Sequence, residues 1–289
     1  MFTVVIESLN WIAKTHLPLG DYVRLVFDKL SNNYGFFFEQ LSFFLLKIIN
    51  SLLFILQWPN PLVSTIIISS ITFVMRRCIL VSLFTAMGLL LIINQGYWKE
   101  TTETLALVLV STFMSMAIGV PLGVLSARRK WLYAIVRISL DLMQTIPTFV
   151  YLIPVLVLFG LGMVPGLIAT IIFSIPASVR LTRLGVISTP PDLTEAALAF
   201  GATPGQVFRK VELPFAIPQI MAALTQTIML SLSMVVIAAL VGADGLGVPV
   251  LRALNTVDIG KGFEAGFCIV ILAIILDRMF SIVGVRDTV

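Results

Sequence analysis

The stretch STPPDLTEAALAFGATPGQVFRKVELP, residues 188–214, is a polar interruption in a largely apolar chain. On its two sides lie apolar runs, at about residues 163–181 and 215–241, each long enough to cross a membrane as a helix. Composition agrees with a multi-pass membrane protein, since 58% of the residues are hydrophobic, 12% are charged and the mean hydropathy is +1.05. These values exclude a disordered chain, a coiled coil and a nucleic-acid-binding protein.

The pattern inside residues 188–214 predicts two short helices joined by a tight turn. Thr189 is expected to cap the first helix, and Gly201 to end it in the left-handed conformation. Thr203 and Gln206 have the spacing of a capping box, which predicts a second helix ending at Pro214. The loop is therefore a compact helical pair between two spans.

This helical pair carries apolar side chains that water would not favour: Phe200, Val207, Phe208 and Val211. One explanation is that a groove on a partner protein covers them. The other is that they pack against the ends of neighbouring membrane helices. The physical pattern alone leaves both explanations open.

We predict an all-α polytopic membrane protein with about seven transmembrane helices. Two accessory helices fall in residues 61–98, and residues 99–289 form a five-helix core that includes the loop at 188–214. The apolar runs occur at residues 61–76, 78–96, 104–127, 133–160, 163–181, 215–241 and 263–283. Prolines at positions 147 and 154 are expected to interrupt the fourth run.

Residues 1–60 are predicted to form an amphipathic scaffold on the membrane surface. Residues 1–35 mix charged and apolar side chains in a way that suits short amphipathic helices, and no cleaved signal segment is expected. Polar residues in the range 36–57 cluster on about half of a helix, which favours an interfacial helix. An eighth spanning helix is the alternative, in which Glu39 and Lys47 would be costly.

Charge predicts the orientation of the chain. Basic residues concentrate in the loops after the first, third and fifth spans: Arg76, Arg77, Arg128, Arg129, Lys130, Arg180, Arg183, Arg209 and Lys210. Loops rich in lysine and arginine stay in the cytoplasm. We therefore expect an inner-membrane protein with its N-terminus outside and its C-terminus in the cytoplasm.

Polar groups inside the spans predict a translocation path. Gln226 and Ser233 lie seven residues apart on one helix face, with Met229 nearby, and Gln144 and Thr145 precede the expected break at Pro147. The alternative is that these groups form hydrogen bonds between packed helices. Arg137 lies one turn before Asp141, so we expect that pair to be structural.

Catalytic and metal chemistry are not expected. The chain has one histidine, His16, and two distant cysteines, Cys78 and Cys268, which suit neither a metal site nor a nucleophile with its base. No G-x-x-x-x-G-K-[ST] segment is present to bind nucleotide phosphates. We therefore predict that the chain is not an enzyme and binds no cofactor itself.

The loop resembles the EAA loop of permease subunits of binding-protein-dependent ABC importers. The residues that carry the resemblance, at the family's spacing, are Glu195, Ala196, Ala197, Gly201, Val211, Leu213 and Pro214. Val211 stands where the family more often has isoleucine. The resemblance implies that these residues dock into a separate ATPase subunit, which binds ATP and Mg²⁺.

A wider resemblance, over about residues 90–283, is to the glycine betaine/proline betaine or choline-type branch. It rests on GYWKE at 96–100, TLALV at 104–108, IGVPLGVLSA at 118–127, DLMQTIP at 141–147, FVYLIP at 149–154, QTIML at 226–230, SMVVIAA at 233–239 and FEAG at 263–266. Asp244 departs from the small residue usual in that branch. An amino-acid or methionine importer is the alternative.

The resemblance also implies the partners of the chain. A pair of ATPase subunits offers two clefts and each permease chain offers one loop, so a homodimer with two ATPases is expected in the lipid bilayer. An extracytoplasmic substrate-binding protein would deliver the solute. A secondary transporter or channel is disfavoured, because the chain shows no clear inverted repeat.

Overall fold

The computed structural model describes residues 18–281, and every regular element in that range is helical. The helices in chain order are α2 (Leu19–Gln57), α3 (Pro61–Arg76), α4 (Ile79–Asn94), α5 (Trp98–Arg128), α6 (Lys130–Thr145), α7 (Thr148–Phe159), α8 (Met163–Ile187), α9 (Pro191–Ala199), α10 (Pro204–Val207), the π-helical segment η1 (Phe208–Glu212), α11 (Leu213–Ser233), α12 (Val235–Ala239), α13 (Gly247–Thr256) and α14 (Ile259–Phe280). The predicted all-α class is confirmed.

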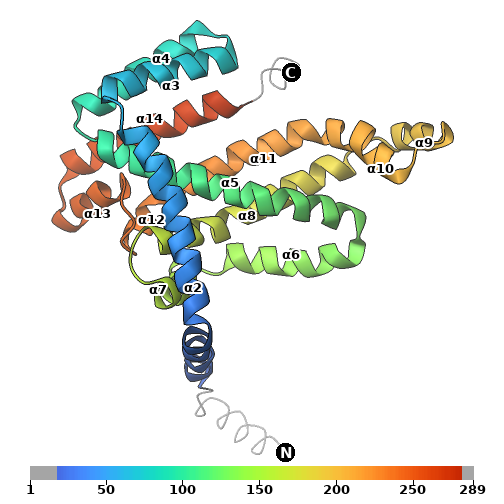
Figure 1. Ribbon diagram of the computed structural model, residues 1–289, viewed down its shortest axis with the longest axis horizontal. Helices are drawn as coiled ribbons and strands as arrows, with labels where there is room; N and C mark the ends of the chain where they lie inside the picture. The colour runs from blue at the N-terminus through green and yellow to red at the C-terminus, as the bar shows by residue number, and fades with distance from the viewer. Residues whose placement is uncertain (1–17, 282–289) are drawn as a thin grey trace, which may run out of the picture.

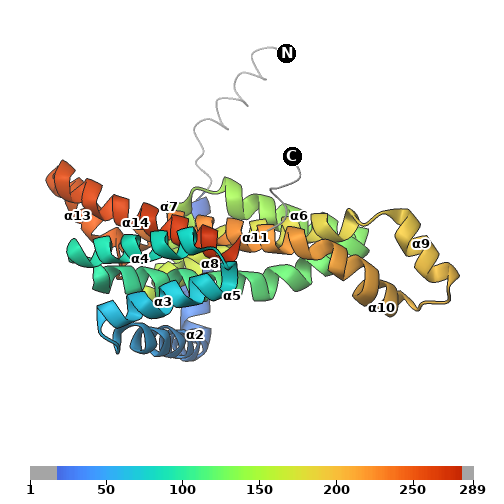
Figure 2. The same ribbon diagram turned by 90° about the horizontal axis from the view of Figure 1, so that it is seen from above.

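The long helices α5, α8, α11 and α14 run side by side along the longest axis of the molecule (Figures 1 and 2). Each is long and apolar enough to cross a membrane, and the pair α6 and α7 qualifies when it is counted as one bent span. These five units correspond to the predicted five-helix core. The described helices α9 and α10 lie at one end of this bundle, and α13 lies at the other (Figures 1 and 2).

A seam of small residues joins α5 to α8. The Ser115 and Ser174 hydroxyls lie 2.7 Å apart, and the Ser178 hydroxyl donates to the Ser115 carbonyl at 3.0 Å. A Cβ atom added to Gly119 would lie 1.8 Å from the Ser178 Oγ, and one added to Gly123 would also collide with α8. The two backbones therefore approach as closely as small-residue packing allows in a membrane.

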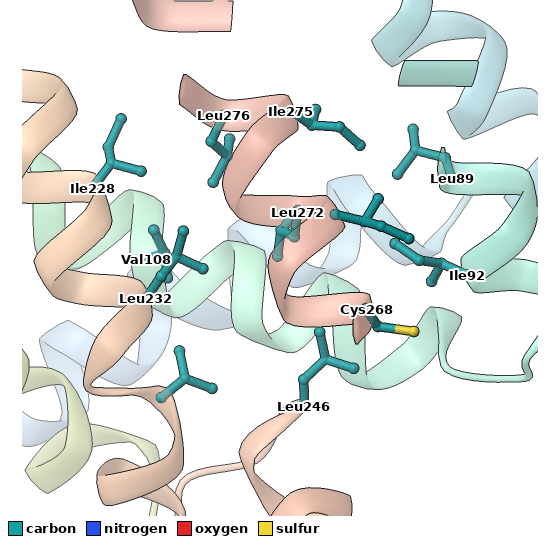
Figure 3. Close-up of a cluster of buried hydrophobic side chains, with 12 residues drawn as sticks. Leu89, Ile92, Val108, Ile228, Leu232, Leu246, Cys268, Leu272, Ile275 and Leu276 are labelled. Atoms are coloured by element: carbon teal, nitrogen blue, oxygen red, sulfur yellow. The ribbon is translucent and has the colours of Figure 1, made fainter. Parts of the chain in front are cut away.

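A second contact layer is a cluster of aliphatic side chains contributed by α4, α5, α11 and α14 (Figure 3). Leu272, Ile275 and Leu276 of α14 point between α11 and α4, where Ile228 and Ile92 are fully or almost fully buried. Cys268 is part of this cluster and is a free, buried thiol. It acts as a small apolar side chain in this cluster.

Helix α2 runs across the bundle instead of along it (Figures 1 and 2). It buries Leu45 and Ile49 against α5 and α8, and the rings of Phe38 and Phe159 meet edge to face at 5.3 Å. Its course suits a helix lying along the membrane, although its length and composition would also allow it to span. The interfacial placement of residues 36–57 therefore stays a prediction.

The prediction of short helices over residues 1–35 is wrong where it can be compared. One continuous helix of 39 residues begins at Leu19, and no proline interrupts it before Gln57, although Ser31, Asn32, Asn33 and Gly35 lie within it. Residues 1–17, including His16, lie outside the described residues.

The accessory helices α3 and α4 form a hairpin of two 16-residue helices, each shorter than a full span. Arg77 makes the sharp turn between them with φ of 49°, a left-handed conformation rare for a residue other than glycine. The Arg76 guanidinium donates to the carbonyl of Ser281, which attaches the hairpin to the end of α14.

The fourth predicted span, 133–160, is not one helix. It is broken into α6 and α7, which meet at an angle of 98°. Pro147 explains the break, because a residue before proline avoids the helical conformation and Ile146 is extended, with ψ of 127°. Pro154 lies inside α7 without ending it.

The sixth predicted span, 215–241, also differs from the structure. The long helix α11 ends at Ser233, and a short separate helix, α12, follows after Met234. The chain then turns at Gly242 and Gly245, which have φ of 86° and 127°. The apolar run continues beyond Ser233 through α12, so its length did not mark the end of the long helix.

Candidate functional site

The predicted pair of loop helices is confirmed, and its first boundary is displaced by one residue. Helix α9 has Pro190 at its cap and Pro191 as its first residue, where Thr189 and Pro190 had been expected. The cause is Pro191 itself, since it holds Pro190 in an extended conformation with ψ of 131°. This pair of helices is the part of the chain that protrudes beyond the bundle (Figures 1 and 2).

The turn between the two loop helices follows the predicted chemistry. Gly201 has φ of 82°, and no atom lies within 4 Å of the position where its Cβ would be. The backbone N–H of Thr203 donates to Oε1 of Gln206 at 2.8 Å, as one arm of a capping box requires. The turn is therefore built locally, without support from the membrane helices.

The second loop helix does not end at Pro214 as predicted. Helix α10 passes through the π-helical segment η1 directly into α11, with Pro214 in the first turn of α11. Proline lacks an N–H and its ring crowds the carbonyl one turn earlier, and a wider π turn accommodates both. The loop is thus continuous with a core helix.

The apolar side chains of the loop divide between the two explanations offered for them. Val207 is buried, and Phe208 and Val211 are half-buried against the rest of the chain. Phe200 is 93% exposed, the largest exposed fraction among the large hydrophobic side chains of residues 18–281. Packing within the chain accounts for the first three and leaves Phe200 uncovered.

The residues assigned to ATPase docking form two groups, one at each end of the loop. Glu195, Ala196 and Gly201 are exposed around the end of α9, and Ala197 is half-buried. At the other end of the loop, Val211 and Leu213 are half-buried and Pro214 is exposed. Their role in docking stays a prediction.

Arg128 connects the loop to the core, a contact that sequence reasoning missed. Its guanidinium lies 3.0 Å from Glu212 and stacks on the ring of Phe208 at 4.3 Å. Arg128 is the last residue of α5, so the contact joins η1 to the helix that forms the seam with α8. The sequence offered only a weak signal for this contact: Arg128 follows the third predicted span, and Glu212 precedes the sixth.

Asp141 has the expected partner and a second one. Arg137 approaches it at 3.7 Å within α6, as predicted, and Arg180 of α8 approaches it at 2.5 Å. Arg183, one turn further along α8, stacks on the ring of Tyr133 at 3.5 Å. These contacts hold α6 on α8 and are consistent with a structural role for Asp141.

The residues predicted to line a path are solvent-accessible in the isolated chain but do not converge. Gln144 and Thr145 are exposed at the end of α6, which packs on α5 and α8. Gln226 and Ser233 are exposed on α11, with Met229 half-buried between them. Among the described residues, neither glutamine side chain makes a hydrogen bond to another helix.

The described residues were also compared with the requirements of a metal site. No group of three or more histidine, cysteine, aspartate and glutamate side chains is placed to hold an ion.

Residues 119–286, which include the whole protruding loop, match the family described as "Binding-protein-dependent transport system inner membrane component". The chain belongs to this family. It is therefore a multi-pass inner-membrane permease subunit of a binding-protein-dependent transport system. Membership accounts for the loop, the apolar helices and the five-unit core together.

Relatives within the family extend over nearly the whole chain. The glycine betaine transport system permease protein OpuAB of Bacillus subtilis is 42% identical over 93% of this chain and 95% of its own length. The glycine betaine/carnitine transport permease protein GbuB of Listeria monocytogenes is 42% identical over 91% of this chain and 94% of its own.

A solved structure supports the fold of the core. The chain matches the inward-facing MetNI methionine ABC transporter with a TM-score of 0.54 and 28% identity, covering 64% of this chain and 90% of the matched one.

Proposed function

We propose that this permease translocates glycine betaine, proline betaine or a choline-like osmoprotectant across the inner membrane, driven by ATP. The supporting observation is the 42% identity, over more than nine tenths of the chain, to two relatives named for glycine betaine transport. The methionine alternative rests on a lower identity over a smaller part of the chain. A quaternary ammonium solute keeps its charge at every pH, so it needs a polar route through lipid.

ATP hydrolysis is assigned to a separate subunit, which binds ATP and Mg²⁺. The chain contains no phosphate-binding loop, and its protruding helix α9 presents the exposed Phe200 beside Glu195 and Ala196. An exposed aromatic side chain on a short helix is a suitable anchor for a groove on a partner. Docking of α9 into the ATPase would transmit its movement through η1 into α11.

The separation of permease and ATPase into different subunits suggests how the transporter assembles. Two copies of the chain would bind two ATPase subunits, one at each protruding loop. The loop end carries Arg128 at the end of α5 and Arg209 and Lys210 in η1, which supports a cytoplasmic position for this end and an external position for the α13 end. A substrate-binding protein would then dock at the α13 end.

The translocation path is assigned to surfaces that are exposed in one copy. Gln144, Thr145, Gln226, Met229 and Ser233 belong to helices that do not pack on each other, so the second copy would close the route between them. Weak polar contacts suit a solute that must leave as readily as it enters.

The test is solute uptake and ATP hydrolysis by the permease reconstituted with its ATPase and binding protein. Glycine betaine should stimulate hydrolysis and accumulate in the vesicles, whereas methionine should do neither. Stimulation by methionine alone would contradict the proposed substrate and leave family membership intact. Gln226→Leu with Ser233→Ala should lower uptake without changing assembly, and unaltered uptake would remove these residues from the path.

A further inference from the structure

A polar pocket of about 510 Å³ opens at the end of the bundle opposite α9 and α10, between the start of α5, helix α13 and the turn that precedes α13. Tyr97, Glu100 and Glu103 line it from the α5 side, and Asp244 and Arg252 line it from the α13 side. The other grooves described in the structure are lined mainly by apolar side chains. A concave polar surface at one end of a membrane protein can bind a small polar solute.

Several charges in this pocket have no ion-pair partner among the described residues. Lys99 pairs with Glu103 at 3.8 Å, and Lys261, which also lines the pocket, pairs with Asp258 at 3.8 Å. Within residues 18–281, Glu100, Asp244 and Arg252 make no ion pair.

Two carboxyl groups in the pocket are also withdrawn from water. The Glu100 Oε2 atom is buried without a hydrogen-bond partner, and Glu103 is 9% exposed. A buried carboxylate oxygen without a partner costs free energy, so Glu100 would gain from a bound cation, whereas Glu103 already pairs with Lys99.

The lining also provides an aromatic ring. Tyr97 lies just before α5 and is half-buried at the pocket. Burial raises the pKa of its phenol, and nearby Glu264 adds to the rise, so the ring is neutral at physiological pH. A neutral aromatic face and nearby carboxylates are both attractive to a quaternary ammonium group, whereas Arg252 is suited to a carboxylate.

We propose that this pocket binds a small zwitterion, with the quaternary ammonium group at Tyr97, Glu100 and Asp244 and the carboxylate at Arg252. The assignment rests on the proposed function, because betaines are zwitterions of this kind. The pocket would hold the solute at the entrance to the permease after the binding protein releases it. Exposure of Asp244 and Arg252 keeps the site wet, so the binding should be weak and quickly reversible.

Direct binding tests the assignment. The permease–ATPase complex in lipid nanodiscs, without binding protein, is titrated with glycine betaine and separately with choline, which lacks the carboxylate. Tryptophan fluorescence reports binding, because Trp98 adjoins Tyr97 in the chain. Both solutes should saturate the signal.

Two pocket variants test the contacts of the carboxylate and of the ammonium group separately. Arg252→Gln should weaken glycine betaine about tenfold and leave choline unchanged, and Asp244→Asn should weaken both by about tenfold. Arg24→Gln and Asp28→Asn are matched controls, because they alter an exposed ion pair on α2 and should bind both solutes like the wild type.

Three results would overturn the pocket: no saturable binding, equal binding by wild type and variants, or normal betaine binding by variants that have lost stimulation by the binding protein. The last result would assign the pocket to protein docking. Uptake with the binding protein is measured in parallel. Uptake of betaine without direct binding would overturn the pocket alone, whereas uptake of another solute and not betaine would overturn the proposed function.

Discussion

The seam between α5 and α8 and the turn after α9 both depend on glycine, for opposite reasons. At the seam, a Cβ on Gly119 would lie 1.8 Å from the Ser178 Oγ, so glycine is needed because another helix occupies the space. At the turn, nothing lies within 4 Å of a Cβ on Gly201, and glycine is favoured because φ is 82°. Gly119 therefore allows two helices to pack closely, and Gly201 allows the chain to turn.

The same contrast separates the apolar side chains of the two regions. In the core, Ile92, Leu107 and Ile228 are almost completely buried. At the protrusion, Phe200 is 93% exposed. The main packing partners of α9 are its neighbours in the loop, α10 and η1. Residues at the seam should therefore control folding, and residues at the protrusion should control what happens after folding.

The largest effect is expected from Gly119→Val at the seam. The added side chain would overlap α8, and overpacking of this severity should prevent normal assembly, with a loss of about 3 kcal/mol or more. The measurement is the yield of monodisperse protein in mild detergent and its thermal midpoint. Gly35→Val on α2 is the matched control, since its Cβ meets nothing within 4 Å. Normal folding of Gly119→Val would contradict the seam.

Glu195→Lys and Gly201→Asp alter the protruding loop, and they should impair coupling to the ATPase. Glu195 is exposed, so Glu195→Lys should leave yield and thermal midpoint close to the wild type. Gly201→Asp should cost about 1 kcal/mol, because a φ of 82° strains a residue with a Cβ atom, and the protein should still fold. Substrate-stimulated ATP hydrolysis should fall by about tenfold or more, as expected for disruption of a binding anchor region. Stimulation equal to that of the wild type would remove the loop from energy coupling.

Phe200→Ala should weaken binding of the ATPase by about tenfold. An aromatic anchor that becomes buried at an interface contributes about 1–3 kcal/mol to binding. Binding of labelled ATPase to nanodiscs measures this effect. Phe43→Ala on α2 removes another exposed ring, 67% accessible, far from the loop and should leave the affinity unchanged. Equal affinities for the two variants would leave Phe200 without a docking role.

The smallest effect is expected at the contact between the two regions. Arg128→Gln, Glu212→Gln and the double variant form a mutant cycle on the thermal midpoint. The pair is partly exposed, at 40% and 22% of the side chains, so its coupling energy should be about 0.5 kcal/mol. A coupling energy of zero would mean that the stacking on Phe208, not the ion pair, joins the loop to α5.

Patterns that depend on neighbouring residues were predicted well. Apolar runs located the core membrane helices but not all of their ends. Gly201 and Gln206 marked the loop turn, because a turn uses contacts a few residues apart. The docking role of Glu195 and Ala196 is a prediction from resemblance alone, since no ion pair or side-chain hydrogen bond of these residues within 18–281 indicates a role.

Other features required the folded chain. The 98° bend at Pro147 was expected only as an interruption, because a proline shows where a helix can break and its neighbours determine the angle. The π-helical segment before Pro214 and the second partner of Asp141 were not anticipated.

The sequence alone determined that this protein is a helical membrane protein, since hydropathy, loop charge and local capping act over short distances along the chain. Its assignment as a permease came from the resemblance of residues 188–214 to a known family. Only the tertiary structure decided which small residues form the seam, that Arg128 holds the loop, and that Tyr97 and Arg252 line one pocket. Each of these features joins residues that are far apart in sequence. Their proximity depends on how whole helices pack, and no local pattern encodes it.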